Sequence, residues 1–506
     1  MVTNMYHDLP RCTPEQAGIP SKAILRWLDA LEATGSELHG FMIARHGKVC
    51  AEGWWAPYAP HFVHGLQSLT KTYTVTALGL LHDEGKLGLD EKIVDVLSRY
   101  VPANHAPELD KATVRDVLRM SSGVKPHFDI SEPDWLTRYF SLPGEYEPGS
   151  FYFYSGTTTA VGGAIVRERT GEGLLSYMKP RLFDKIGIDS TRIRTYYTGD
   201  GLEYGGGGFF TTTEDNLRLM MLYLNKGMWN GERVLSEEWC QEVTTKQIET
   251  ATEANNNPGV DDNYYGYGLQ CWMCRPEGVY RADGAMGQFS IVVPHLDMVI
   301  SINEAGDQSK LQHQRALETV WDVLLPGVHQ PLPESNDAAI LRSRLERLTL
   351  PRTVYALREN SIMELGRTQW KFERNNLFML AGVTFMRQGQ EKAGIDDVCF
   401  DFSDAQEALL CWKQGNTAMQ VRIGTAGQYA VNRGDYGPVH LEWLYAIGGW
   451  ISKDTFEVQF ELVETCFSTT VRFHVENQSL TLTLIPRLPQ PGAPYGSQSI
   501  QSIKEA

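Results

Sequence analysis

The stretch Val63-His64-Gly65-Leu66-Gln67-Ser68-Leu69-Thr70-Lys71-Thr72 carries a serine and a lysine three residues apart. Apolar residues follow at near-helical spacing, namely Val75, Leu78, Leu80 and Leu81. This pattern predicts a helix that begins near Ser68 and ends at Asp83-Glu84-Gly85. Residues three apart lie on one face of a helix, so we expect the Ser68 hydroxyl and the Lys71 amine to point the same way.

A serine and a lysine in this arrangement can form a nucleophile with its base. A serine hydroxyl attacks effectively once a neighbouring group takes its proton. A lysine can be that base if burial or nearby positive charge lowers its pKa. The same four residues also fit a helix N-cap followed by a surface lysine, so the rest of the chain has to decide between these interpretations.

Length and composition limit the classes of protein to which this chain can belong. The 506 residues predict two or three domains, and 42% hydrophobic with 21% charged residues is typical of a globular protein. A net charge of −16 disfavours a nucleic-acid partner. No apolar run is long enough to predict a membrane span.

The terminus and the cysteines predict the compartment. The first eight residues show neither a basic nor an apolar signal region, and the eight cysteines are scattered along the chain. Cys271 and Cys274 form a C-x-x-C pair that has no second pair, so we expect reduced thiols and no metal site. These features predict a cytoplasmic protein without a cofactor.

The order of predicted elements indicates an α+β fold. Strand-like segments at 41–49, 265–272 and 287–303 enclose a helical region, which predicts an antiparallel sheet with a helical insertion. A proline-rich stretch marks a linker at 329–337 between a domain at 1–328 and an all-β barrel or sandwich at 338–506. The clearest hairpin pairs 470–475 with 479–484.

Six motifs occur in order within about residues 15–325: Gln67–Lys71, Leu80–Leu87, Val114–Gly123, Tyr154-Ser155-Gly156, Gly205–Asp215 and Ala282-Asp283-Gly284. They resemble the S-x-x-K motif, a helix end, the T-x-x-x-L-L-x-x-x-S-G segment, Y-x-N, a glycine-rich turn and K-T-G or H-x-G of one superfamily. This superfamily contains the penicillin-binding proteins and class C β-lactamases. The resemblance implies a β-lactamase-like catalytic domain at 1–328, followed by the all-β domain.

The resemblance also implies catalytic roles. Ser68 would attack an acyl carbon, and Lys71 would accept its proton. Tyr154 would relay a proton to the leaving group and later activate water, with its pKa lowered by the charge of Lys71. Tyr152 is the alternative for this role. The backbone N–H groups of Ser68 and Ala285 would form the oxyanion hole.

Two departures from the family pattern bear on the substrate. Gly156 replaces an asparagine that contacts a substrate amide, and Ala282 replaces the cation that helps to hold a substrate carboxylate. Arg281 is a poor substitute for that cation, because adjacent strand residues point to opposite faces. Both departures disfavour a β-lactamase or cell-wall carboxypeptidase and resemble the esterase and amide-hydrolase branch of the superfamily.

Further residues are predicted to bind substrate. Gly156, Asp283 and Gly284 would border the bound substrate, and Gly284 would allow it to approach the strand backbone closely. Trp135 and Tyr139 lie in an aromatic-rich loop region and would line an acyl pocket.

The sequence therefore predicts a serine hydrolase that cleaves an ester or amide bond of a small molecule. An acyltransferase with the same acyl-enzyme, a D-amino-acid peptidase or β-lactamase, and a binding protein on a hydrolase fold remain alternatives. The C-terminal domain could shield the site, mediate contacts in a homodimer or add stability.

Overall fold

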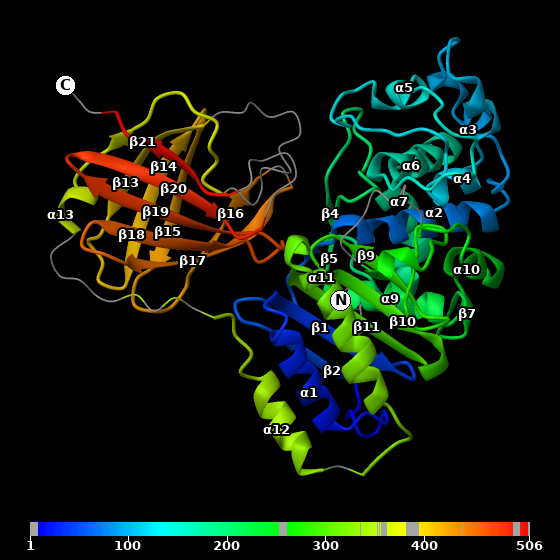
Figure 1. Cartoon of the computed structure of the whole chain (residues 1–506), viewed down its shortest axis with the longest axis horizontal. Helices are drawn as coiled ribbons and strands as arrows, with labels where there is room; N and C mark the ends of the chain where they lie inside the picture. The colour runs from blue at the N-terminus through cyan, green and yellow to red at the C-terminus, as the bar shows by residue number, and fades with distance from the viewer. Residues whose placement is uncertain are drawn as a thin grey trace, which may run out of the picture. The chain divides into compact units, whose positions relative to one another are not determined.

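The structure is a computed structural model that describes residues 9–251, 261–333, 335–351, 353, 355, 362–380, 394–437, 439–488 and 496–503. The chain divides into two compact units, Met1–Thr349 and Leu350–Ala506. The first has the β-lactamase-like α+β fold and the second is all-β (Figure 1). Both predicted fold classes are thus confirmed.

The first unit is built on a six-stranded antiparallel sheet. Its strand order is β2 (Lys48–Trp54), β1 (Glu37–Arg45), β11 (Met298–Ala305), β10 (Gln288–Val293), β9 (Tyr280–Gly284) and β8 (Trp272–Met273). Strand β1 pairs with β11 over most of its length, although about 250 residues separate them in sequence. The segment between β2 and β8 is the predicted helical insertion.

Helices cover both faces of this sheet. Trp27 of α1 (Ser21–Glu32) packs edge-on against Phe41 of β1, with ring centroids 5.1 Å apart. Phe41 pairs with Ile302, whereas the next residue, Asn303, points to the opposite face. There it accepts a 2.8 Å hydrogen bond from Thr213 of α9 (Thr213–Leu224).

The helical insertion carries its own core. Helix α2 (Thr70–Asp83) is buried on all sides from Thr70 to Leu81, and it packs against α6 (Gly156–Thr170). Other elements surround this helix, so its threonines and Lys71 are buried together with its apolar residues. The remaining helices here are α3 (Ile93–Val96), α4 (Val114–Leu118), α5 (Trp135–Phe140), α7 (Leu174–Met178), α8 (Asp184–Ile186) and α10 (Glu237–Thr244).

Short strands complete the first unit. Three short strands form a small sheet in the order β3 (His64–Gly65), β5 (Phe209–Thr211) and β4 (Arg194–Thr195). Strand β3 lies just before Ser68 in the chain. Strands β6 (Met228–Trp229) and β7 (Glu232–Arg233) form a hairpin. Pairing of His64 with Thr211 therefore joins the segment before α2 to the segment before α9.

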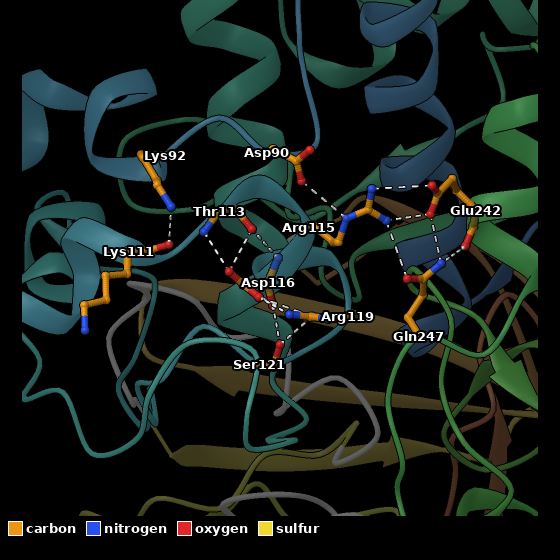
Figure 2. Close-up of polar contacts among 10 residues, drawn as sticks. All are labelled: Asp90, Lys92, Lys111, Thr113, Arg115, Asp116, Arg119, Ser121, Glu242 and Gln247. Atoms are coloured by element: carbon orange, nitrogen blue, oxygen red, sulfur yellow. Dashed lines mark hydrogen bonds and ion pairs between the residues drawn. The ribbon is translucent and has the colours of Figure 1, made fainter.

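Polar contacts fix α4 within the insertion (Figure 2). Thr113 and Asp116 cap the helix reciprocally, because each side chain bonds the backbone N–H of the other. Arg115 bonds Glu242 of α10 at 2.6 Å, and Asp116 bonds Arg119 at 2.6 Å. These contacts tie α4 to α10 and to the turn that follows α4.

The division between the units lies beyond the linker expected at 329–337. Helix α12 (Asn336–Leu345) packs against α1, and Arg344 bonds Glu32 of that helix at 2.6 Å. Thr349 then forms a bridge with Ala56. Residues 338–349, expected in the C-terminal domain, therefore belong to the first unit, because their contacts are with α1 and the segment after β2.

The second unit contains a ten-stranded sheet. Its strands are β12 (Trp370–Lys371), β13 (Ile395–Asp401), β14 (Glu407–Gln414), β15 (Thr417–Gly424), β16 (Ala430–Tyr436), β17 (Leu441–Trp450), β18 (Thr455–Glu461), β19 (Ser468–Glu476), β20 (Ser479–Pro486) and β21 (Gln498–Gln501). Phe372 bridges Ser502, and the Ile503 N–H bonds the Lys371 carbonyl at 2.8 Å. These links join the first and last strands, so the sheet closes into a barrel. A short helix, α13 (Ile362–Leu365), precedes β12.

The predicted hairpin is the β19–β20 pair. Glu476 pairs with Ser479, and the two turn residues, Asn477 and Gln478, have φ values of 50° and 60°. Positive φ at both positions is the signature of a type I′ turn, whose twist matches the flanking strands. Among the helices that the structure describes, none combines the length and apolarity needed to cross a membrane.

Candidate active site

Ser68 lies in a single 3₁₀ turn, Gln67–Leu69, that leads directly into α2. The Leu66 N–H bonds the Phe209 carbonyl at 2.9 Å, and the Phe209 N–H bonds Thr70 Oγ1 at 3.1 Å. Gln67 has a φ of 51°, which is costly for a residue with a side chain. Such strain persists only where the surroundings enforce it, and it is common at functional turns.

Lys71 is buried beside the half-buried Ser68. Its Nζ donates to Ser68 Oγ at 2.7 Å and to the Gly206 carbonyl at 2.5 Å. Burial lowers the pKa of Lys71 to about 7, although the negative charge of Asp283 acts in the opposite direction. A large fraction of Lys71 is therefore neutral near pH 7, and a neutral amine can accept the Ser68 proton.

Tyr154 completes a group of three side chains around Ser68 Oγ. Its hydroxyl is hydrogen-bonded to Ser68, and Lys71 Nζ lies 4.8 Å from the centre of its ring. The next residue, Ser155, caps α6 by accepting the Thr158 N–H at 3.3 Å, which holds Tyr154 at the start of that helix. Trp272 packs on Tyr154 with ring centroids 5.3 Å apart.

The expected lowering of the Tyr154 pKa is wrong. Burial raises the pKa of Tyr154 above its usual range, while the hydrogen bond to Ser68 acts in the opposite direction without overcoming it. Burial dominates because a phenolate loses its water shell in this enclosed position. Tyr154 is therefore a neutral phenol near pH 7 that can donate its proton.

Tyr152, the alternative to Tyr154, points elsewhere. Its ring packs against Tyr267 and Trp272 at 5.5 and 6.0 Å. Its buried hydroxyl forms no hydrogen bond with any described residue. The geometry thus favours Tyr154 over Tyr152 for contact with Ser68.

The end of strand β9 lies against the turn that carries Ser68. A Cβ atom on Gly284 would come within 2.0 Å of the Leu66 carbonyl oxygen. Gly284 therefore accommodates the backbone before Ser68. Ala285, the residue expected to supply the second oxyanion-hole N–H, follows Gly284 directly in the chain.

Asp283 precedes Gly284 and is held by two basic side chains. Arg281 Nε and His313 Nε2 lie 2.7 and 3.4 Å from its Oδ2 atom. Burial alone would raise the pKa of Asp283, but His313 and Arg281 outweigh it, and the pKa falls below its usual range. Arg281 is completely buried, so it supports Asp283 and does not replace the missing cation at Ala282.

Gly156 lies at the first position of α6, opposite Tyr204. A Cβ atom at residue 156 would come within 2.2 Å of the Tyr204 hydroxyl oxygen. Tyr204 thus occupies the space that a side chain at residue 156 would need. Sequence reasoning missed Tyr204, although its place directly before the glycine run Gly205–Gly208 marks a turn with close backbone packing.

Trp135 and Tyr139 do not line a pocket, contrary to the prediction. Both side chains of α5 are completely buried in the core of the helical insertion. Trp135 Nε1 donates to Asp200 at 2.8 Å, and the Tyr139 hydroxyl donates to Ser122 at 2.8 Å. The aromatic composition of this region serves packing, because α5 has to bury one face against the insertion.

A cavity of about 470 Å³ lies elsewhere in the first unit. It is lined by His82, Gly88, Leu89, Asp90, Glu91, Arg115, Glu238, Trp239 and Glu242. Figure 2 shows that Arg115 is already bonded to Glu242 and paired with Asp90 there. The cavity shares no residue with the group around Ser68, so its size does not mark the catalytic site.

Comparison with known proteins defines the class. The Beta-lactamase family profile matches residues 28–323, more than half of the chain. The chain belongs to this family and is a β-lactamase-family hydrolase.

Individual relatives are distant. The chain is 25% identical over 335 residues to the 6-aminohexanoate-dimer hydrolase of Paenarthrobacter ureafaciens, an alignment that covers 59% of this chain and 83% of that protein. It is 21% identical over 328 residues to a putative D-alanyl-D-alanine carboxypeptidase of Salmonella schwarzengrund, covering 49% and 74%. A penicillin-binding protein homologue from Caulobacter crescentus aligns in structure with a TM-score of 0.49 and 16% identity, covering 62% of this chain and all of that one.

Proposed function

We propose that this protein is a serine hydrolase that cleaves an ester or amide bond of a small molecule through an acyl-enzyme on Ser68. One observation carries the proposal: Ser68 Oγ lies 2.7 Å from Lys71 Nζ, and burial lowers the pKa of that amine to about 7. A base whose pKa lies near the working pH is efficient in proton transfer.

The residues support a two-step reaction. Neutral Lys71 takes the proton of Ser68 Oγ, which bonds to the substrate carbonyl carbon, and the backbone N–H groups of Ser68 and Ala285 stabilise the oxyanion. The neutral phenol of Tyr154 gives its proton to the leaving alcohol or amine and regains one from protonated Lys71. Water then bonds to the acyl carbon as neutral Lys71 takes its proton, and Lys71 passes that proton to Ser68 Oγ as the bond between the acyl carbon and Oγ breaks and the acid leaves.

Two relatives bear names of hydrolases for amide or peptide substrates, which supports amides as one substrate class. Ala282 and Gly156 lack the side chains that contact a substrate carboxylate and amide in penicillin-type recognition. We therefore place esters and simple amides ahead of β-lactams. The proposal needs no cofactor, because proton transfer and acyl transfer use only the three side chains and two backbone groups.

Covalent labelling tests the proposal. The purified protein is exposed to a fluorophosphonate and its intact mass is measured, while hydrolysis of p-nitrophenyl butyrate is followed in parallel. We expect one adduct and ester turnover in wild type and in Ser150→Ala, which removes an exposed serine. Both signals should disappear in Ser68→Ala.

Either of two results would contradict the proposal. One is an adduct that persists in folded Ser68→Ala, and the other is folded wild type that neither labels nor hydrolyses the ester. Addition of a short alcohol, with product analysis, shows whether the acyl group passes to water or to the alcohol.

A further inference from the structure

The charged side chain at the end of β9, Asp283, has the opposite sign from the one that a carboxylate substrate needs. On the basis of the proposed function, we propose that Asp283 binds a primary ammonium group of the substrate and that the enzyme prefers amino-substituted esters or amides. Its preferred substrates would then differ in charge from penicillins and peptide C-termini.

The first step of the argument is the location of Asp283. It directly precedes Gly284, which lies against the Leu66 carbonyl in the Ser68 turn, and it stands two residues before Ala285. Two residues of a strand span about 6–7 Å, which is the scale of a short acyl or alcohol chain. The carboxylate also acts electrostatically on both Lys71 and Tyr154, so its charge is felt at the reacting group.

The second step concerns which oxygen is available. Arg281 Nε and His313 Nε2 both reach Oδ2 of Asp283. Within the described ranges, no hydrogen bond reaches Oδ1 of this carboxylate. A carboxylate oxygen accepts hydrogen bonds only, so Oδ1 suits an N–H donor of the substrate.

The third step concerns which charge is exposed. The side chain of Asp283 is 10% exposed, whereas those of Arg281 and His313 are 0% and 1% exposed. The other guanidinium donors of Arg281 are bonded to Asn263 at 2.6 Å and to the Met273 carbonyl at 3.1 Å. A substrate therefore meets the Asp283 carboxylate and neither the Arg281 guanidinium nor the His313 ring.

The fourth step is discrimination. Ala282, at the position of the family cation, is buried and uncharged. A substrate carboxylate near Asp283 would meet a like charge without a compensating cation, whereas an ammonium group would gain a charge-assisted hydrogen bond. Hydrogen bonds to charged groups predict a preference of roughly ten- to a hundredfold.

A matched substrate series tests this preference. Alkyl esters are prepared whose acyl or alcohol chain ends, about three to six atoms from the carbonyl carbon, in an ammonium, a methyl or a carboxylate group. We expect kcat/KM of wild type to be at least about tenfold higher for the ammonium ester than for the methyl and carboxylate esters of the same length. In Asp283→Asn, the kcat/KM for the ammonium ester divided by that for the methyl ester should fall to about one. The control Asp297→Asn removes a charge at an exposed hairpin turn and should keep the wild-type ratio.

Equal or better turnover of the methyl or carboxylate esters by wild type would overturn the inference, as would an ammonium preference that persists in Asp283→Asn. If Asp283→Asn fails to fold because Arg281 loses its partner, the kcat/KM ratios of wild type for the three esters decide whether the ammonium preference exists. Turnover of p-nitrophenyl butyrate by wild type but not by Ser68→Ala reports separately on the proposed function. Loss of the charge preference with that turnover intact would contradict only the ammonium site.

Discussion

The hydroxyl oxygen of Tyr204 lies 2.2 Å from the position of a Cβ atom on Gly156. A side chain at residue 156 would therefore collide with Tyr204. We expect Gly156→Ala to destabilise the protein by about 1–3 kcal/mol, as overpacked sites do, although alanine is the better helix former.

Removal of the Tyr204 hydroxyl should relieve this collision, since the next atoms lie 3.4 Å from that Cβ position. In a Tyr204→Phe background, Gly156→Ala should then cost less than 1 kcal/mol by rough estimate. Urea unfolding of the four proteins of this cycle measures the coupling. An undiminished penalty in the phenylalanine background would show that another contact excludes the side chain.

The pKa of Lys71 predicts how activity depends on pH. Burial lowers it to about 7, so the neutral amine predominates above pH 7 and the ammonium form below it. We expect kcat/KM for p-nitrophenyl butyrate to rise with pH through a single transition near pH 7. A profile that stays flat between pH 5 and 9 would exclude Lys71 as the titrating base.

The charge of Asp283 should shift this transition. The carboxylate raises the pKa of Lys71, because a nearby negative charge favours the ammonium form. In Asp283→Asn, the acid limb of the pH profile should therefore move to lower pH. Asp297→Asn serves as the control and should leave the limb unchanged, because Asp297 pairs with His46 at an exposed turn.

A permanent cation at residue 71 should abolish catalysis. Lys71→Arg keeps the positive charge, but a guanidinium group does not lose its proton and cannot accept one from Ser68. We expect kcat/KM to fall by about 10²–10⁴-fold with the fold retained. Circular dichroism checks the fold, and near-normal activity would show that Lys71 only orients Ser68.

Tyr154 and Tyr152 can be separated by removal of one hydroxyl at a time. Tyr154→Phe removes the hydrogen bond to Ser68 and should lower kcat by about 10²–10⁴-fold. Tyr152→Phe removes a buried hydroxyl that has no partner within the described part of the chain, so it should keep the activity. Loss of activity in Tyr152→Phe, with Tyr154→Phe active, would reverse the assignment.

Trp135 should matter for stability and not for substrate choice. Its side chain is completely buried in α5, and Nε1 bonds Asp200 at 2.8 Å. We expect Trp135→Ala to lower the free energy of unfolding by about 3–5 kcal/mol. The relative kcat/KM values for esters of different acyl length should not change, and a change in that ranking would restore Trp135 to the substrate pocket.

Local sequence patterns were enough to predict those features whose contacts join residues close together in the chain. The Ser68–Lys71 pairing depends on residues one helical turn apart, and the β19–β20 hairpin depends on a two-residue turn. Trp135 and Tyr139 were misplaced because aromatic residues in a loop-like segment fit a pocket and a core equally well, and burial depends on distant neighbours.

The sequence by itself determined the α+β fold of the first unit, the all-β C-terminal part and the proximity of Ser68 and Lys71, because their spacing along one helix places those two side chains together. Only the tertiary structure decided that burial keeps Tyr154 neutral, that Tyr204 fills the space beside Gly156, and that Arg281 and His313 support Asp283. Each of these three features depends on segments that are far apart in the chain. The side chains are buried, and the charged groups lie close together, only once those segments have packed together.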